Sequence, residues 1–158
     1  MLALQRKGDF PQKAPNIGFW KPHLLRLFGD LDRQLRTNPA IDSTNSGSTA
    51  VMLLVTKENL ACASLGDSRC FLYPFSSEED PLELSVSHLP TDQAEADRIL
   101  AAGGKIHCAR NKFGEHGPLR VFGPKGKTPG LMMTRSFGDG FAHSECGVIS
   151  VPGRKGSH

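Results

Sequence analysis

Residues 47–69 read GSTAVMLLVTKENLACASLGDSR, in which two apolar runs are separated by a short polar segment. The first run, AVMLLVT from Ala50, is almost continuously apolar, a pattern typical of a strand covered on both faces. Residues 57–59 supply a turn, and LACASL, residues 60–65, returns as a second strand whose small side chains permit close packing. The stretch predicts a β-hairpin at the centre of the fold.

A glycine turn follows the second strand and carries a lone aspartate. Gly66, Asp67 and Ser68 interrupt the apolar pattern, and RCFLY, residues 69–73, resumes it before Pro74. This pattern predicts a third strand, and therefore a three-stranded meander with Asp67 at one of its turns.

Composition and charge exclude several classes of protein. A chain of 158 residues with 38% hydrophobic content suits one ordinary domain with a real core. The formal charge of +3 favours neither a nucleic-acid nor a membrane partner. The longest apolar run, residues 50–55, is too short to span a bilayer, and the N-terminus becomes charged too early for a signal peptide. We expect an intracellular protein, cytoplasmic or nuclear, with no nucleic-acid or membrane partner.

The four cysteines show no metal-binding spacing. Cys62, Cys70, Cys108 and Cys146 are far apart and include no C-x-x-C pair, so a zinc finger is not expected. We interpret them as reduced, buried thiols.

The chain divides into three parts by pattern. Residues 1–20 form a poorly defined N-terminal segment, residues 21–152 form the domain, and residues 153–158 form a polar tail that is expected to be frayed.

Two helices are expected within the domain. Between Trp20 and Asn38, leucines recur at intervals of three and four residues, and Pro22 suits a first-turn position. Thr91 or Asp92 is expected to cap a second helix that runs to about Ala102, and Asp92 with Glu95 resembles a capping box. Both helices carry an apolar stripe, and the first is expected to pack on the sheet.

The remaining segments alternate between strands and loops. Residues 105–108 and 119–122 read as two paired strands joined by a turn. GPKGKTPG, residues 123–130, reads as a flexible basic loop, and GVISVP, residues 147–152, as one more strand.

A second aspartate lies between glycines in LMMTRSFGDG, residues 131–140. Asp67 and Asp139 each follow a glycine at the end of an apolar segment, where carboxylate oxygens can hold Mg²⁺ or Mn²⁺. A single aspartate in such a place is more often a turn or cap residue. Arg69 and Arg135 could bind phosphate, although a surface ion pair is their more usual role. No serine has an identifiable base partner, which disfavours a serine-nucleophile hydrolase.

Four segments together resemble the metal-dependent protein serine/threonine phosphatase family of the 2C type, also called PPM-type. They are SGSTAV (46–51), LGDSR (65–69), ADRILAAGG (96–104) and PGLMMTRSFGD (129–139). The resemblance covers the middle portion of the family's domain. It implies an α+β fold, a partial β-sandwich flanked by helices in α/β/β/α layers and truncated at both ends.

The resemblance also implies a reaction and a site. Members hydrolyse phosphoserine and phosphothreonine in phosphoprotein substrates by metal-activated water, with Mn²⁺ or Mg²⁺ as cofactor. Asp139 matches a ligand of the metal centre and Asp67 a ligand of an additional, weaker metal position. The supporting residues are Thr49, Gly66, Arg69, Arg135 and Gly138. No catalytic residue is identifiable beyond the metal ligands.

Some family motifs have no counterpart in this chain. No D-G-H-G-G motif precedes the first predicted helix, and no D-G-x-x-D motif follows residue 139. An alternative function is therefore a catalytically inactive phosphatase-like fragment acting as a binding or regulatory module. An RNA-binding domain that uses basic residues such as Lys125 and Lys127 ranks last, because exposed aromatic residues are not interleaved with them.

Overall fold

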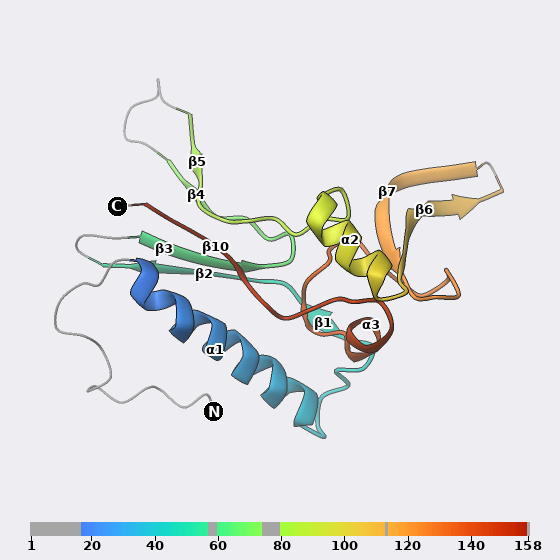
Figure 1. The fold of residues 1–158 in the computed structure, drawn as a ribbon, viewed down its shortest axis with the longest axis horizontal. Coiled ribbons are helices and arrows are strands. Elements are labelled where there is room, and N and C mark those ends of the chain that lie inside the picture. Colours follow the sequence, from blue (N-terminus) through green and yellow to red (C-terminus); the bar gives the residue numbers. More distant parts are fainter. Residues whose placement is uncertain (1–16, 57–59, 74–79, 113, 158) are drawn as a thin grey trace.

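The computed structural model describes residues 17–56, 60–73, 80–112 and 114–157 (Figure 1). The predicted turn at residues 57–59 and most of the N-terminal segment lie outside the described residues. In chain order the elements are α1 (Ile17–Thr37), β1 (Gly47–Ser48), β2 (Ala50–Val55), β3 (Leu60–Leu65), β4 (Phe71–Leu72), β5 (Leu82–Glu83), α2 (Gln93–Ala101), β6 (Lys105–Asn111), β7 (Gly114–Phe122), β8 (Pro129–Leu131), β9 (Phe137–Gly138), α3 (Gly140–Glu145) and β10 (Gly153–Ser157).

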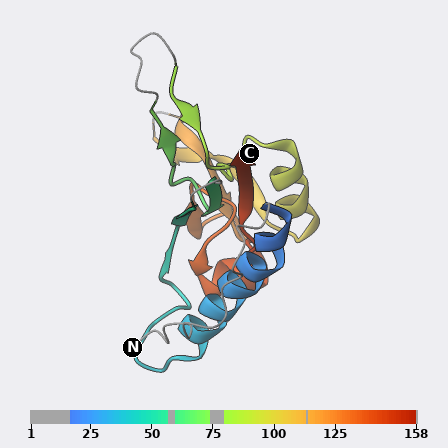
Figure 2. The same cartoon turned by 90° about the vertical axis from the view of Figure 1, so that its left-hand side faces the viewer.

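Helix α1 packs on one face of an antiparallel sheet of order β10-β3-β2 (Figures 1 and 2). Leu24 and Phe28 of the helix contact Ala63 and Leu65 of β3, and the Phe28 ring lies 5.3 Å from the ring of Phe137. The predicted amphipathic helix is confirmed, since its leucine face forms this core. The first-turn position expected for Pro22 is wrong, because α1 already begins at Ile17.

Strand β2 is covered on one face only. It pairs with β3 as predicted, from Ala50 opposite Leu65 to Val55 opposite Leu60. However, Val51, Leu53 and Val55 are exposed. The expectation of a strand buried on both faces is therefore wrong, because α1 covers only the face that carries Ala50 and Met52.

The third strand of this sheet is not the one that the apolar pattern indicates. Phe71–Leu72 pairs with β5, whereas the free edge of β3 is taken by β10. Residues 153–157, predicted as a frayed tail, thus form a strand in register with residues 60–64. The sequence pattern misses it because strand pairing uses backbone groups and needs no apolar side chains.

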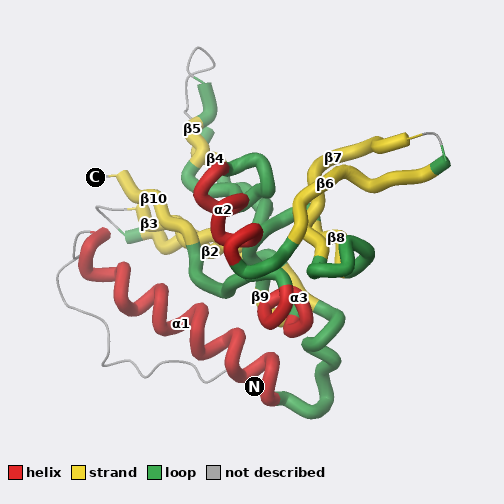
Figure 3. Tube along the Cα trace, turned by 45° about the vertical axis from the view of Figure 1, so that its right-hand side comes forward, coloured by secondary structure: helices red, strands yellow, loops and turns green. Residues whose placement is uncertain are grey.

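A second core forms between α2, α3 and a sheet of order β6-β7-β8. Its buried members are Ile99, Val121, Ala142, Cys146 and Val148. The β6-β7 hairpin is longer than predicted and projects away from the rest of the molecule (Figure 3). Residues 147–152 form no strand beyond one isolated bridge, so that prediction is wrong, and the six-residue helix α3 is too short for its periodicity to be recognised.

Helix α2 begins as the sequence predicts, with the Asp92 carboxylate accepting a hydrogen bond from the Glu95 N–H at 3.1 Å. The four cysteines are free, in agreement with the prediction of reduced thiols, but only Cys62 and Cys146 are buried, whereas Cys70 and Cys108 are half-buried. Burial raises the pKa of the Cys146 thiol to about 11. Among the described residues, no helix has the length and apolar character needed to cross a membrane.

Candidate active site

Asp139 is held in an uncommon backbone conformation at the turn between β9 and α3. Its φ of 43° and ψ of 45° lie in the left-handed region, which aspartate tolerates better than most residues. Only 7% of the residue is exposed, and its Oδ2 atom is buried without a hydrogen-bond partner among the described residues. A buried carboxylate oxygen is costly to leave unpaired, so this atom indicates a place for an ion or a water molecule.

The residues before β2 form the opposite wall of this turn. Strand β1 pairs with β9, and the Asp139 N–H donates to the Ser46 carbonyl at 2.8 Å. A Cβ atom on Gly47 would lie 2.1 Å from Asp139 Oδ2. A glycine is therefore required at residue 47 for the carboxylate to occupy this position, which gives the G-S-T motif a structural role.

A carboxylate on α1 forms a hydrogen bond with the backbone of the turn that carries Asp139. Asp32 accepts a hydrogen bond from the Gly138 N–H at 2.9 Å in a buried environment. Arg36 lies 3.7 Å from the same carboxylate and 3.2 Å from His143 Nδ1. The spacing of Asp32 in the helix carries no signal that it contacts a residue more than a hundred positions away.

Asp67 lies on the turn after β3, and this turn packs against Thr49, the residue between β1 and β2. Gly66 has a φ of +88°, and a Cβ atom there would lie 2.3 Å from Thr49 Cγ2. The hydroxyl groups of Thr49 and Ser68 are 2.8 Å apart. Because Gly47 contacts the Asp139 carboxylate and Thr49 contacts the Asp67 turn, both aspartates lie at the same end of β2.

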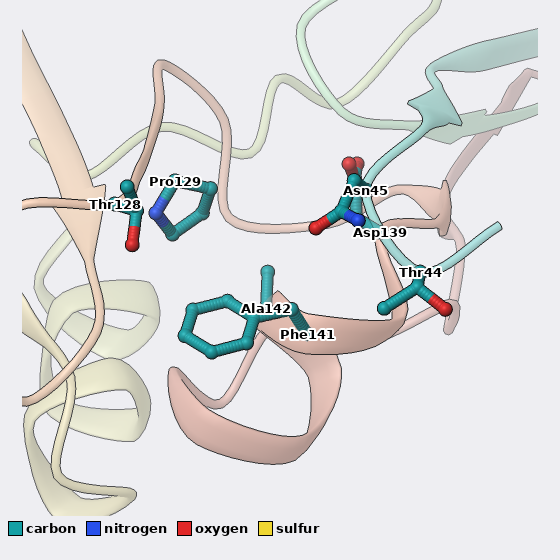
Figure 4. Close-up of a pocket in the computed structure, with 7 residues that line it drawn as sticks. All are labelled: Thr44, Asn45, Thr128, Pro129, Asp139, Phe141 and Ala142. Carbon is teal, nitrogen blue, oxygen red and sulfur yellow. The ribbon is translucent and has the colours of Figure 1, made fainter. Parts of the chain in front are cut away.

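A cavity of about 360 Å³ opens beside Asp139 (Figure 4). It is lined by Thr44, Asn45, Thr128, Pro129, Asp139, Phe141 and Ala142. The 123–130 loop supplies one wall and the start of α3 the base. The cavity thus joins residues 44–45 to two segments, 128–129 and 139–142, that lie much later in the chain.

Arg69 and Arg135, which the sequence offered as possible phosphate ligands, form ion pairs with acidic residues of the protein itself. The Arg135 guanidinium donates through Nε and Nη2 to Glu95 and through Nη1 to the Val151 carbonyl at 2.7 Å. Arg69 lies 3.9 Å from Glu83 on the surface. The structure therefore places both arginines in ion pairs, and Arg135 does not line the cavity.

Glu95, which the sequence suggested only as a capping-box residue, is the centre of a buried polar network that sequence reasoning missed. Its carboxylate accepts hydrogen bonds from Arg98 at 2.8 Å and from the Thr134 hydroxyl at 2.5 Å, in addition to those from Arg135. Burial alone would raise the pKa of Glu95, but these donors outweigh burial and hold the pKa well below its usual range. The capping-box interpretation is half right, because the Glu95 side chain faces this network instead of the helix N-terminus.

The buried side chain of His88 should make the free energy of unfolding depend on pH. The residue is 2% exposed, its Nε2 has no partner among the described residues, and burial lowers its pKa. The unfolded state therefore binds a proton more readily, and the free energy of unfolding should fall as the pH drops below about 6.5. Denaturant titrations at about pH 7.5 and 5.5 measure this change. The variant His88→Asn should show a smaller change, and an unchanged slope would contradict the assignment.

Comparisons with known proteins identify the family of this chain. The family model described as "Protein phosphatase 2C" matches residues 22–155. This chain belongs to the protein phosphatase 2C family. It is 34% identical over 143 residues to "Probable protein phosphatase 2C 73" of Arabidopsis thaliana, covering 89% of this chain and 37% of the relative. It is 35% identical over 153 residues to "Probable protein phosphatase 2C 38" of Oryza sativa subsp. japonica, covering 96% of this chain and 32% of the relative.

The fold also matches solved structures of phosphatases. A serine-threonine phosphatase 2C from Toxoplasma gondii superposes with a TM-score of 0.68 at 20% identity, covering 96% of this chain and 51% of the other. This match shows the fold, which is the α+β fold of the family. The chain therefore spans between about a third and a half of the length of the relatives it matches.

The protein phosphatase 2C family is metal-dependent, and the donor atoms present fit a divalent cation in part. Asp139 Oδ2, which has no hydrogen-bond partner among the described residues, is the kind of hard oxygen that Mg²⁺ and Mn²⁺ prefer. However, the described residues contain no group of three or more His, Cys, Asp or Glu side chains that could hold a metal ion. Asp139 thus fits as one ligand, and the described part of the chain does not form a complete coordination shell.

Proposed function

We propose that this chain is part of a metal-dependent phosphatase that hydrolyses phosphoserine and phosphothreonine in proteins. Membership of the protein phosphatase 2C family supports the proposal. The observation that carries it is the Asp139 carboxylate, which is buried, lines the cavity and has no hydrogen-bond partner at Oδ2 in the part of the chain that the structure describes.

Asp139 and Asp67 are the proposed metal ligands, with Mn²⁺ or Mg²⁺ as the ion. A divalent cation supplies charge neutralisation for phosphoryl oxygens and lowers the pKa of a coordinated water. The chain's own contribution is to fix the ligands in place. Asp32 holds the Gly138 N–H, the Ser46 carbonyl accepts the Asp139 N–H, and Gly47 leaves room for the carboxylate.

The cavity has walls suited to a phosphorylated side chain. Phe141, Ala142 and Pro129 provide apolar surface for its carbon atoms, while Thr44, Asn45 and Thr128 provide polar surface around it. Pockets that combine apolar walls with a few polar groups are typical of ligand sites.

Manganese binding and turnover test the proposal directly. Calorimetry of the purified chain with Mn²⁺ should show binding, and hydrolysis of a phosphothreonine peptide should require the metal. Measurable binding with metal-dependent turnover supports the phosphatase function. Absence of both would contradict it for this chain and favour the alternative of an inactive binding or regulatory module.

A further inference from the structure

The 123–130 loop forms a closed turn at the rim of the cavity. The Gly123 N–H donates to the Thr128 carbonyl at 2.6 Å, and the Gly126 N–H donates to the Gly123 carbonyl at 2.8 Å. Thr128 and Pro129, at the end of the loop, line the cavity that contains Asp139 (Figure 4). The sequence predicted a flexible loop, whereas these bonds close it into a defined turn.

Aromatic and polar contacts anchor both ends of the loop. The ring of Phe122 stacks on His107, with centroids 4.0 Å apart and planes inclined by 5°. Arg120 donates to the Gly130 carbonyl at 2.7 Å, just after the loop has passed Pro129. The loop is therefore held on the β6-β7 hairpin, and side chains that it carries are presented at a fixed place beside the cavity.

Both charged residues of the 123–130 loop are lysines. Lys125 and Lys127 are exposed on the loop, and Lys105 of β6 lies beneath it, since a Cβ atom on Gly126 would be 3.6 Å from Lys105 Cδ. None of these three lysines forms an ion pair with an acidic residue in the described ranges. Lys125 and Lys127 thus lie on the loop whose later residues, Thr128 and Pro129, line the cavity.

Resting on the proposed function, we propose that Lys125 and Lys127 bind acidic side chains that flank the phosphorylated residue of the substrate. When the phosphorylated residue of a peptide enters the cavity, the residues on either side of it must lie across the rim of the cavity. An extended peptide advances about 3.3–3.6 Å per residue, so residues within a few positions pass the loop. Exposed cations at a binding rim select oppositely charged partners, and the favoured substrate class is acidic phosphopeptides.

Binding to three peptides of one length tests this proposal. Each carries one phosphothreonine, flanked by glutamates, alanines or lysines, and affinity is measured by fluorescence anisotropy with the whole chain. Two exposed ion pairs are expected to make the glutamate peptide bind about fivefold to tenfold more tightly than the alanine peptide at low ionic strength. The difference should vanish near 1 M salt, where the Debye length is about 3 Å.

Charge reversal identifies the residues responsible. The double variant Lys125→Glu and Lys127→Glu should lose the preference for the glutamate peptide and favour the lysine peptide. The double variant Lys21→Glu and Arg26→Glu makes the same charge change on α1, and it should keep the wild-type preference. Equal affinities of the wild-type chain for the glutamate and alanine peptides would overturn the proposal. A loop double variant that retains the preference would also overturn it. So would single-stranded RNA that binds the same lysines as tightly as the glutamate peptide does.

Hydrolysis of p-nitrophenyl phosphate by the wild-type chain with Mn²⁺ separates this inference from the proposed function. The compound has no flanking residues, so its turnover reports the reaction alone. Failure of turnover together with a retained peptide preference would contradict the phosphatase activity of this chain and leave the role of the loop supported. Turnover without a peptide preference would support the phosphatase activity of this chain and contradict the role of the loop in substrate selection.

Discussion

Asp139→Asn should reduce manganese-dependent hydrolysis of a phosphothreonine peptide by about 100-fold or more. Even residues that only orient a metal ligand change affinity or activity by roughly 10- to 100-fold, and a ligand should matter at least as much. Asparagine tolerates the left-handed backbone conformation at residue 139, so the fold should survive. Initial rates at saturating Mn²⁺, with calorimetric titration of the metal, measure the effect.

Two further variants make this test specific. Asp67→Asn should reduce activity by a smaller factor, about tenfold, because Asp67 is assigned to the weaker metal position. Asp97→Asn removes an exposed carboxylate from α2 and should leave activity unchanged. If Asp139→Asn bound manganese and hydrolysed the peptide as well as the wild-type chain, the assignment of Asp139 as a ligand would be wrong.

Glu95→Ala should lower the free energy of unfolding by about 3–5 kcal/mol. Glu95 is 5% exposed, and its carboxylate bonds Arg98, Thr134 and Arg135. Removing it leaves two arginine side chains without their buried counter-ion, and breaking a buried ion pair from one side is strongly destabilising. Denaturant titration monitored by circular dichroism measures the loss.

The pH dependence of stability provides a second readout for Glu95. Its pKa is lower in the folded state, so the stabilisation is complete above the unfolded value of about 4.3 and is lost as the pH falls below it. Glu95→Ala should therefore be less sensitive to acid than the wild-type chain. Asp97→Ala, on the exposed face of the same helix, should change stability by less than about 0.5 kcal/mol. A comparable loss from both variants would show that the network contributes little.

The elements that could be predicted are those whose residues contact neighbours close in sequence. The leucine periodicity of α1 and the Asp92 cap of α2 depend on spacings of three or four residues. The β2-β3 pair depends on a short turn. Local spacing decides these features, and a single sequence displays it.

The elements that could not be predicted depend on partners far away in the chain. The polar segment 153–157 becomes a strand because β3 offers a free edge. β2 is exposed on one face because α1 covers only the other. Neither the free edge nor the uncovered face has a signature in the residues concerned.

The sequence by itself determined the family, the two glycine turns that carry Asp67 and Asp139, and the basic character of residues 123–130. Only the tertiary structure decided that Gly47 faces the Asp139 carboxylate, that Asp32 holds the turn at Gly138, and that the basic loop borders the same cavity. The physical reason is that residue types and local spacing set which chemistry is available. Which groups meet is set by packing between segments about a hundred residues apart, and that packing leaves no periodic trace in the chain.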